Sequence, residues 1–78
     1  MTQVTASVLR NRVAANVRRL RKAAGLTLAK ASELADVDMR YWQKIEASEA
    51  NITIGVLTKL GRALDVEPNV LLQRPPRN

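Results

Sequence analysis

Residues 26–46 read LTLAKASELADVDMRYWQKIE, and this stretch decides the fold. Two short runs with helical spacing of apolar residues flank a three-residue joint, DVD, at 36–38. Thr27 and Asp38 each precede one run, and both residue types are favoured as N-caps because their side chains accept hydrogen bonds from backbone N–H groups. The stretch therefore predicts two helices joined by a tight turn, at residues 28–35 and about 39–47.

Each of these helices has a face suited to packing. In the second, Trp42 and Ile45 lie three residues apart and turn toward the core. Its outward side chains are then Met39, Arg40, Gln43 and Lys44. The first helix offers a narrow face of small residues to a neighbour, namely Ala31, Ser32 and Ala35.

A further helix is predicted before this pair. One apolar face is formed by Leu9, Val13, Val17, Leu20 and Ala24. We expect Ser7 to cap the start of this helix and Gly25 to end it as the C′ residue in a left-handed conformation. Residues 1–6 are predicted to form a flexible arm.

Two more helices are predicted after the pair. Thr53 precedes an apolar series that predicts a helix over 54–64, made of Ile54, Leu57, Leu60 (or Gly61) and Leu64. Pro68 suits the first position of a short fifth helix that carries Val70, Leu71 and Leu72. The remaining residues, 73–78, are predicted to form a basic flexible tail, so the domain spans 7–72.

Composition limits both the fold class and the chemistry. The 78 residues include one Tyr, one Trp and no Phe, which favours one small all-α domain with an aliphatic core. The chain has no Cys and no His, which argues against an enzyme, a metal site or a cofactor. No apolar run suggests a signal peptide or a membrane span, so we expect a cytoplasmic protein. The net charge of +6 favours polyanionic partners.

The layout of the central stretch is a helix-turn-helix, whose second helix can enter the major groove of DNA. Four further motifs lie around and beyond this layout: Gly25-Leu26-Thr27, Tyr41…Ile45-Glu46, Asn51-Ile52-Thr53-Ile54 and Leu60…Ala63-Leu64-Asp65-Val66. Through them, residues 13–72 resemble the lambda repressor and Cro-like, or XRE-type, family. The resemblance implies a compact five-helix domain. Asp38-Met39-Arg40-Tyr41, followed by Asn51-Ile52-Thr53-Ile54, is also similar to the small controller proteins of restriction-modification systems. This similarity implies a dimeric transcription regulator.

The chain departs from the family pattern in the helix-turn-helix. Leu28 stands where the family most often has a phosphate-clamping Gln, and Asp36 replaces the turn Gly. Ala31 replaces a core Leu, Ser32 replaces a small Ala, and Trp42 stands where Ile or Val is usual. We expect the Trp42 ring to fill the volume vacated at Ala31, because protein cores are packed to near-crystalline density.

Within this pattern, four residues are the candidates for reading base edges: Met39, Arg40, Gln43 and Lys44. Arg40 can bond a guanine edge, Gln43 an adenine edge and Met39 a thymine methyl group, while Lys44 can also reach a phosphate. The candidates for phosphate contact are Thr27, Lys30, Tyr41 and Asn51. For both sets the alternative is an ordinary capping or solvated role. The resemblance also implies a structural ion pair between Arg21 and Glu46. It implies further that the helix before the pair, which carries Val13 and Val17, lies largely behind the reading helix.

These observations favour a sequence-specific regulator that binds double-stranded DNA as a homodimer on a two-fold operator, with no small-molecule substrate. Apolar residues at 66–72 are candidates for the dimer contact, although they can instead close the core of the monomer. The alternative is a protein-interaction module or an antitoxin on the same fold. In that case Leu28, Met39, Asp36 and Asp38 would contact a protein partner.

Overall fold

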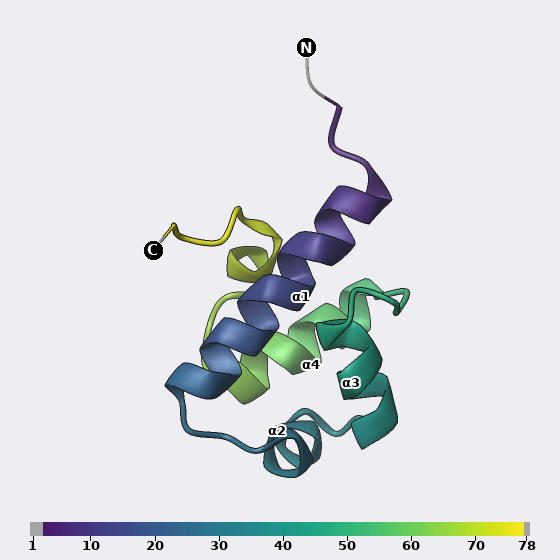
Figure 1. Ribbon diagram of the computed structural model, residues 1–78. Helices are drawn as coiled ribbons and strands as arrows, with labels where there is room; N and C mark the ends of the chain where they lie inside the picture. Colours follow the sequence, from purple (N-terminus) through teal and green to yellow (C-terminus); the bar gives the residue numbers. More distant parts are fainter. Residues whose placement is uncertain (1–2, 78) are drawn as a thin grey trace.

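The computed structural model describes residues 3–77, and within them every regular element is helical. The elements are α1 (Ala6–Ala23), α2 (Leu28–Ala35), α3 (Met39–Glu46), α4 (Ile54–Leu64) and the 3-10 helix η1 (Pro68–Leu72). The bounds of α2 and α4 agree with the predicted ones, and α3 ends one residue earlier than expected. In Figure 1, α1 crosses in front of α4, while α2 and α3 form one end of the molecule.

Side-chain caps begin the helices of the central pair as expected. The Thr27 hydroxyl accepts a hydrogen bond from Lys30 N at 3.0 Å, and Asp38 Oδ1 accepts one from Arg40 N at 2.8 Å. The predicted cap of α1 is wrong, because Thr5 rather than Ser7 accepts the bond, from Val8 N at 3.2 Å. Ala6 therefore belongs to α1 and not to the arm. Residues 1–2 of that arm lie outside the described residues.

Left-handed residues end the first two helices. Gly25 has φ +71° after α1, which confirms its role as the C′ residue. Asp36 takes the same role after α2 with φ +55°, where Val37 N donates back to Ser32 O at 3.0 Å. An aspartate tolerates this conformation better than most residues with a side chain. The turn therefore keeps its geometry although the usual glycine is absent.

The core lies between the four α-helices and η1, each of which contributes buried side chains, and Trp42 is its largest fully buried side chain. Trp42, Ala31 and Ile45 belong to one buried cluster with Val13 and Val17 of α1. The expected inward position of Ala24 is wrong: this residue caps the end of α1 and is exposed. Leu60 and Gly61 are both buried, and a Cβ atom on Gly61 would lie 2.8 Å from the carbonyl oxygen of Val66.

The fifth element is a 3-10 helix and not an α-helix. Its last turn is anchored to α1 by the buried Asn16, whose Nδ2 donates to the carbonyl oxygens of Leu71 at 3.0 Å and Gln73 at 2.8 Å. Leu71 is fully buried, so this segment closes the core of the monomer. No helix among residues 3–77 is long and apolar enough to cross a membrane.

Candidate nucleic-acid interface

Helix α3 lies at the surface with its polar side outward. Trp42 and Ile45 hold it to the core, whereas Arg40, Gln43 and Lys44 are exposed. These three side chains line one shallow hollow together with Ala47 and Glu49. Met39, at the start of the helix, is 45% exposed. The structure therefore brings the four candidates for base reading onto one free face.

The start of α2 presents a second set of polar groups. Thr27 and Lys30 are both exposed. The Thr27 oxygen accepts the bond from Lys30 N, so its hydroxyl hydrogen stays free to donate to a phosphate. Lys30 Nζ lies 3.7 Å from Glu33 Oε1 in an exposed ion pair. Such a pair contributes little stability, so Lys30 can readily exchange Glu33 for another anion. Leu28 is half-buried against the core and offers no polar group.

Tyr41 and Asn51 contact each other. The Tyr41 hydroxyl donates to the backbone carbonyl of Asn51 at 2.6 Å, which ties α3 to the loop before α4. Partial burial raises the pKa of Tyr41 above its ordinary value. The hydroxyl hydrogen is therefore already engaged within the protein, while the exposed Asn51 side chain keeps its own donors. Phosphate contact by either residue stays a prediction.

The ion pair between Arg21 and Glu46 is present. Arg21 Nε lies 2.6 Å from Glu46 Oε2 and Nη2 lies 3.0 Å from Oε1, a two-point contact between α1 and α3. Trp42 Nε1 donates to the same Glu46 Oε2 at 2.5 Å. Burial raises the pKa of Glu46, but the bonds from Arg21 and Trp42 and the charges of Arg21 and Arg18 outweigh it, so the pKa lies below its ordinary value.

Two residues that hold the elements around α3 together, Asn16 and Ser48, are not predicted from the sequence. Asn16 interrupts the apolar face of α1, yet it is 1% exposed and holds η1. Ser48, with φ +63°, donates its hydroxyl to Asn11 Oδ1 and fixes the end of α3 to α1. A polar residue at an inward helical position was the one available signal for Asn16, while Ser48 carries none.

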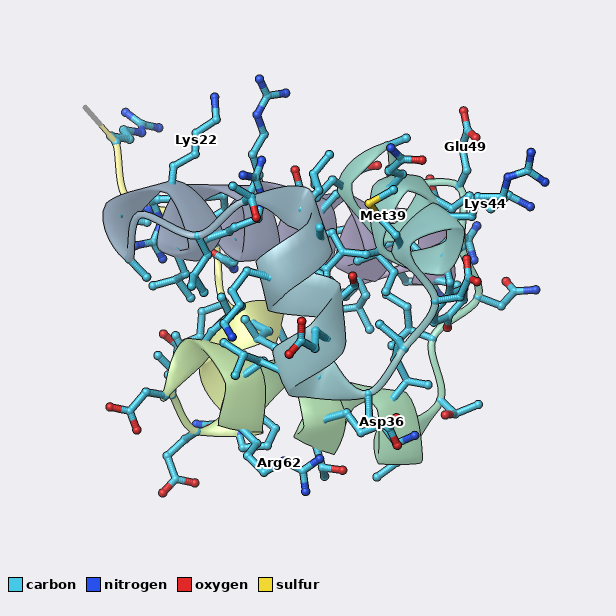
Figure 2. All side chains as sticks on the ribbon, turned by 90° about the horizontal axis from the view of Figure 1, so that it is seen from below. Lys22, Asp36, Met39, Lys44, Glu49 and Arg62 are labelled. Carbon is cyan, nitrogen blue, oxygen red and sulfur yellow. The ribbon has the colours of Figure 1, made fainter. Side chains whose placement is uncertain are left out.

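The residues named for the alternative, a surface for a protein partner, differ in exposure. Asp36, Asp38 and Met39 are exposed, whereas Leu28 is half-buried against the core. In Figure 2, Met39 lies in the upper half of the view and Asp36 near its lower edge. Contact of these residues with a protein partner stays a prediction.

Two short helices, α2 and α3, are joined by a tight turn and packed on a helical core, and the second of them is exposed. This arrangement defines a helix-turn-helix domain. Residues 12–73 match the family described as the helix-turn-helix domain. The chain belongs to this family, and its likeness to the XRE-type domains is confirmed. No curated protein sequence matches the chain.

Several solved structures are similar. The restriction-modification controller protein C.AhdI from Aeromonas hydrophila is 31% identical with a TM-score of 0.76, over 80% of this chain and 94% of that one. The hypothetical transcription factor NHTF from Neisseria is 25% identical with a TM-score of 0.83, over 96% and 87%. An HTH_3 family transcriptional regulator from Vibrio cholerae is 27% identical with a TM-score of 0.81, over 86% of this chain and 38% of that one.

Proposed function

We propose that this protein is a transcription regulator that recognises a specific sequence of double-stranded DNA with α3 in the major groove. The observation that carries the proposal is the free polar face of α3, where Arg40, Gln43 and Lys44 line one hollow while Trp42 fixes the helix from behind. The similar proteins that are described as transcription factors or regulators support it.

The roles follow from side-chain chemistry. Arg40 presents a guanidinium that can bond two acceptors on a guanine edge, and Gln43 presents an amide that matches adenine. Lys44 carries a flexible point charge suited to a base edge or a phosphate. Thr27 and Lys30, with the free backbone N–H groups at the start of α2, are proposed to hold one strand of the backbone.

The test of this function is selection of bound sites from a pool of random duplexes, followed by binding measurements as a function of salt. We expect one preferred sequence and an affinity that falls steeply between about 50 and 200 mM salt, because phosphate binding releases counterions. No enrichment of any sequence, with weak binding that is insensitive to salt, would overturn the proposal.

The protein is proposed to act as a homodimer. Recognition of a two-fold operator by a dimer places two α3 helices one helical turn of DNA apart, and the selected site should then be an inverted repeat. Of the apolar residues at 66–72, Leu71 is used inside the monomer, while Val66, Val70 and Leu72 are half-buried. Sedimentation of the free protein at the concentrations used for binding gives the oligomeric state independently.

Replacement of Arg40 by alanine is expected to relax the preference at one base pair of each half-site, at a cost of about 1 to 3 kcal/mol in binding free energy. Arg40 is exposed on α3 and its side chain makes no contact that the fold needs, so the variant should fold normally. Repeating the site selection with the variant measures the change.

Lys44→Ala is the matched comparison, one helical turn away on the same face. We expect it to weaken binding to all sequences more evenly. If Arg40→Ala kept both the site preference and the affinity of the parent protein, Arg40 of α3 would not read the DNA as proposed.

A further inference from the structure

The segment that carries α3 is not basic. Residues 27–49 contain three cations and five carboxylates, a net charge of −2: Lys30, Arg40 and Lys44 against Glu33, Asp36, Asp38, Glu46 and Glu49. Because Arg21 of α1 neutralises Glu46, the solvent-facing balance is −1. The net charge of this unit therefore does not add to the long-range attraction between the protein and DNA, whatever phosphate contacts it makes locally.

The positive charge is concentrated on α1 instead. This helix contains six cations and no carboxylate: Arg10, Arg12, Arg18, Arg19, Arg21 and Lys22. Residues 50–78 contribute only +2, from four cations and two carboxylates. The field of the protein is therefore dominated by α1, not by α3.

Some of these cations are engaged within the fold. Arg12 Nη1 donates to the carbonyl oxygen of Leu72 at 3.4 Å, and Arg19 Nη2 donates to Asn16 Oδ1 at 3.2 Å, both toward η1. Arg18 and Lys22 differ, because both are exposed and their side chains make no hydrogen bond or ion pair with any other part of residues 3–77. They lie one helical turn apart on one face of α1.

This face lies on the same side of the molecule as the start of α3. In Figure 2, Lys22 and Met39 both lie in the upper half of the view, while Arg62 of α4 lies near the lower edge. Asn11, on the same face of α1, accepts a hydrogen bond from Ser48, which directly follows the end of α3. The charge of Arg18 also helps to lower the pKa of Glu46 on α3. This face of α1 therefore borders α3.

We propose that Arg18 and Lys22, on the outer face of α1, contact phosphate groups of the DNA that flanks the bases read by α3. The inference rests on the proposed function and adds a second contact surface to it. Phosphate contacts carry no sequence information, so α1 would supply affinity and register while α3 supplies sequence preference.

The character of the surrounding surface favours a phosphate backbone over an acidic protein. Beside the two cations this face holds Asn11, whose Oδ1 accepts a bond from Ser48, and the exposed Ala15. Protein interfaces bury aromatic and aliphatic anchors at their centre, whereas the one large apolar side chain here is Val8, 37% exposed and more than two helical turns from Arg18. A row of cations with small polar neighbours matches what a phosphate backbone requires.

The test compares two double variants that lose the same charge. Arg18→Gln with Lys22→Gln removes two cations from the outer face of α1. Lys59→Gln with Arg62→Gln removes two cations from α4. Lys59 Nζ lies 3.9 Å from Asp36 Oδ2. In Figure 2, Asp36 and Arg62 lie near the lower edge of the view, whereas Met39 lies in the upper half. Affinity for the selected site and for a random duplex is measured from about 50 to 200 mM salt, after circular dichroism confirms that both variants are folded.

We expect the α1 variant to lower the slope of log affinity against log salt by about 1.8, or 0.9 for each lost phosphate contact. At 0.1 M salt this corresponds to roughly a 60-fold weaker affinity, equal for the selected and the random duplex. The α4 variant should keep the parental slope. Single Lys22→Gln should give about half of the change in slope.

Equal slopes for the two double variants would overturn the inference, as would a loss confined to the selected sequence. These outcomes are distinct from failure of the proposed function. If the unmodified protein bound no duplex, the function itself would be wrong, whereas salt-sensitive binding with a slope indifferent to Arg18 and Lys22 would remove only the role of α1.

Discussion

Replacement of Trp42 by alanine is expected to lower the free energy of unfolding by about 3 to 5 kcal/mol, as for other fully buried aromatic side chains. Trp42 is 0% exposed and is the largest side chain in the core. Its removal loses the burial of the ring and leaves a cavity that the surrounding helices can only partly close. Urea unfolding followed by circular dichroism measures the change, and a loss below about 1 kcal/mol would contradict it.

The same experiment tests whether Trp42 occupies volume released at Ala31. Both residues are fully buried in one cluster. Ala31→Leu alone should destabilise the protein by about 1 to 3 kcal/mol, because the filled core must be overpacked. In the Trp42→Ala background the same change should recover part of the lost stability. Additive effects of the two substitutions would show that the two sites do not share that volume.

Local rules were sufficient for the elements around the turn. Thr27 and Asp38 are strong capping residues, and Gly25 suits a left-handed end, so the end of α1 and the starts of α2 and α3 follow from single positions. The pairing of Arg21 with Glu46 came from the family resemblance, since no rule of spacing links residues on two separate helices. The outward face of α3 followed from the inward pair Trp42 and Ile45.

The remaining features depend on contacts between distant segments. Ser7 and Thr5 are both acceptable caps, and the choice of Thr5 adds two residues, Ala6 and Ser7, to α1. The segment at 68–72 forms a 3-10 helix whose carbonyls meet Asn16, about 55 residues earlier in the chain. The side on which Lys22 lies relative to Met39 is likewise set by the packing of α1 on α3. Sequence periodicity describes one helix at a time and cannot give these relations.

Replacement of Glu46 by alanine is expected to lower the free energy of unfolding by about 3 kcal/mol, near the lower end of the range for breaking a buried ion pair. The carboxylate accepts two bonds from Arg21 and one from Trp42 Nε1. Its loss leaves a guanidinium that is 13% exposed with only the carbonyl of Leu26, at 3.0 Å, and a buried indole N–H with no acceptor. Glu49→Ala, an exposed glutamate near the end of α3, is the control and should change stability by less than about 0.5 kcal/mol.

The pH dependence of the unfolding free energy should separate the contribution of the Glu46 charge from that of its hydrogen bonds. Because its pKa in the folded protein is lower than the ordinary 4.5, the unfolded chain binds the extra proton first, and the carboxylate contributes stability that is complete above pH 4.5 and is lost as pH falls through the lowered pKa. Glu46→Gln keeps an acceptor for Trp42 but no charge. The difference in unfolding free energy between the parent and Glu46→Gln should therefore be constant near pH 7 and shrink below pH 4.5. A difference that stayed constant to pH 3 would mean that the contact between α1 and α3 depends on the hydrogen bonds and not on the ion pair.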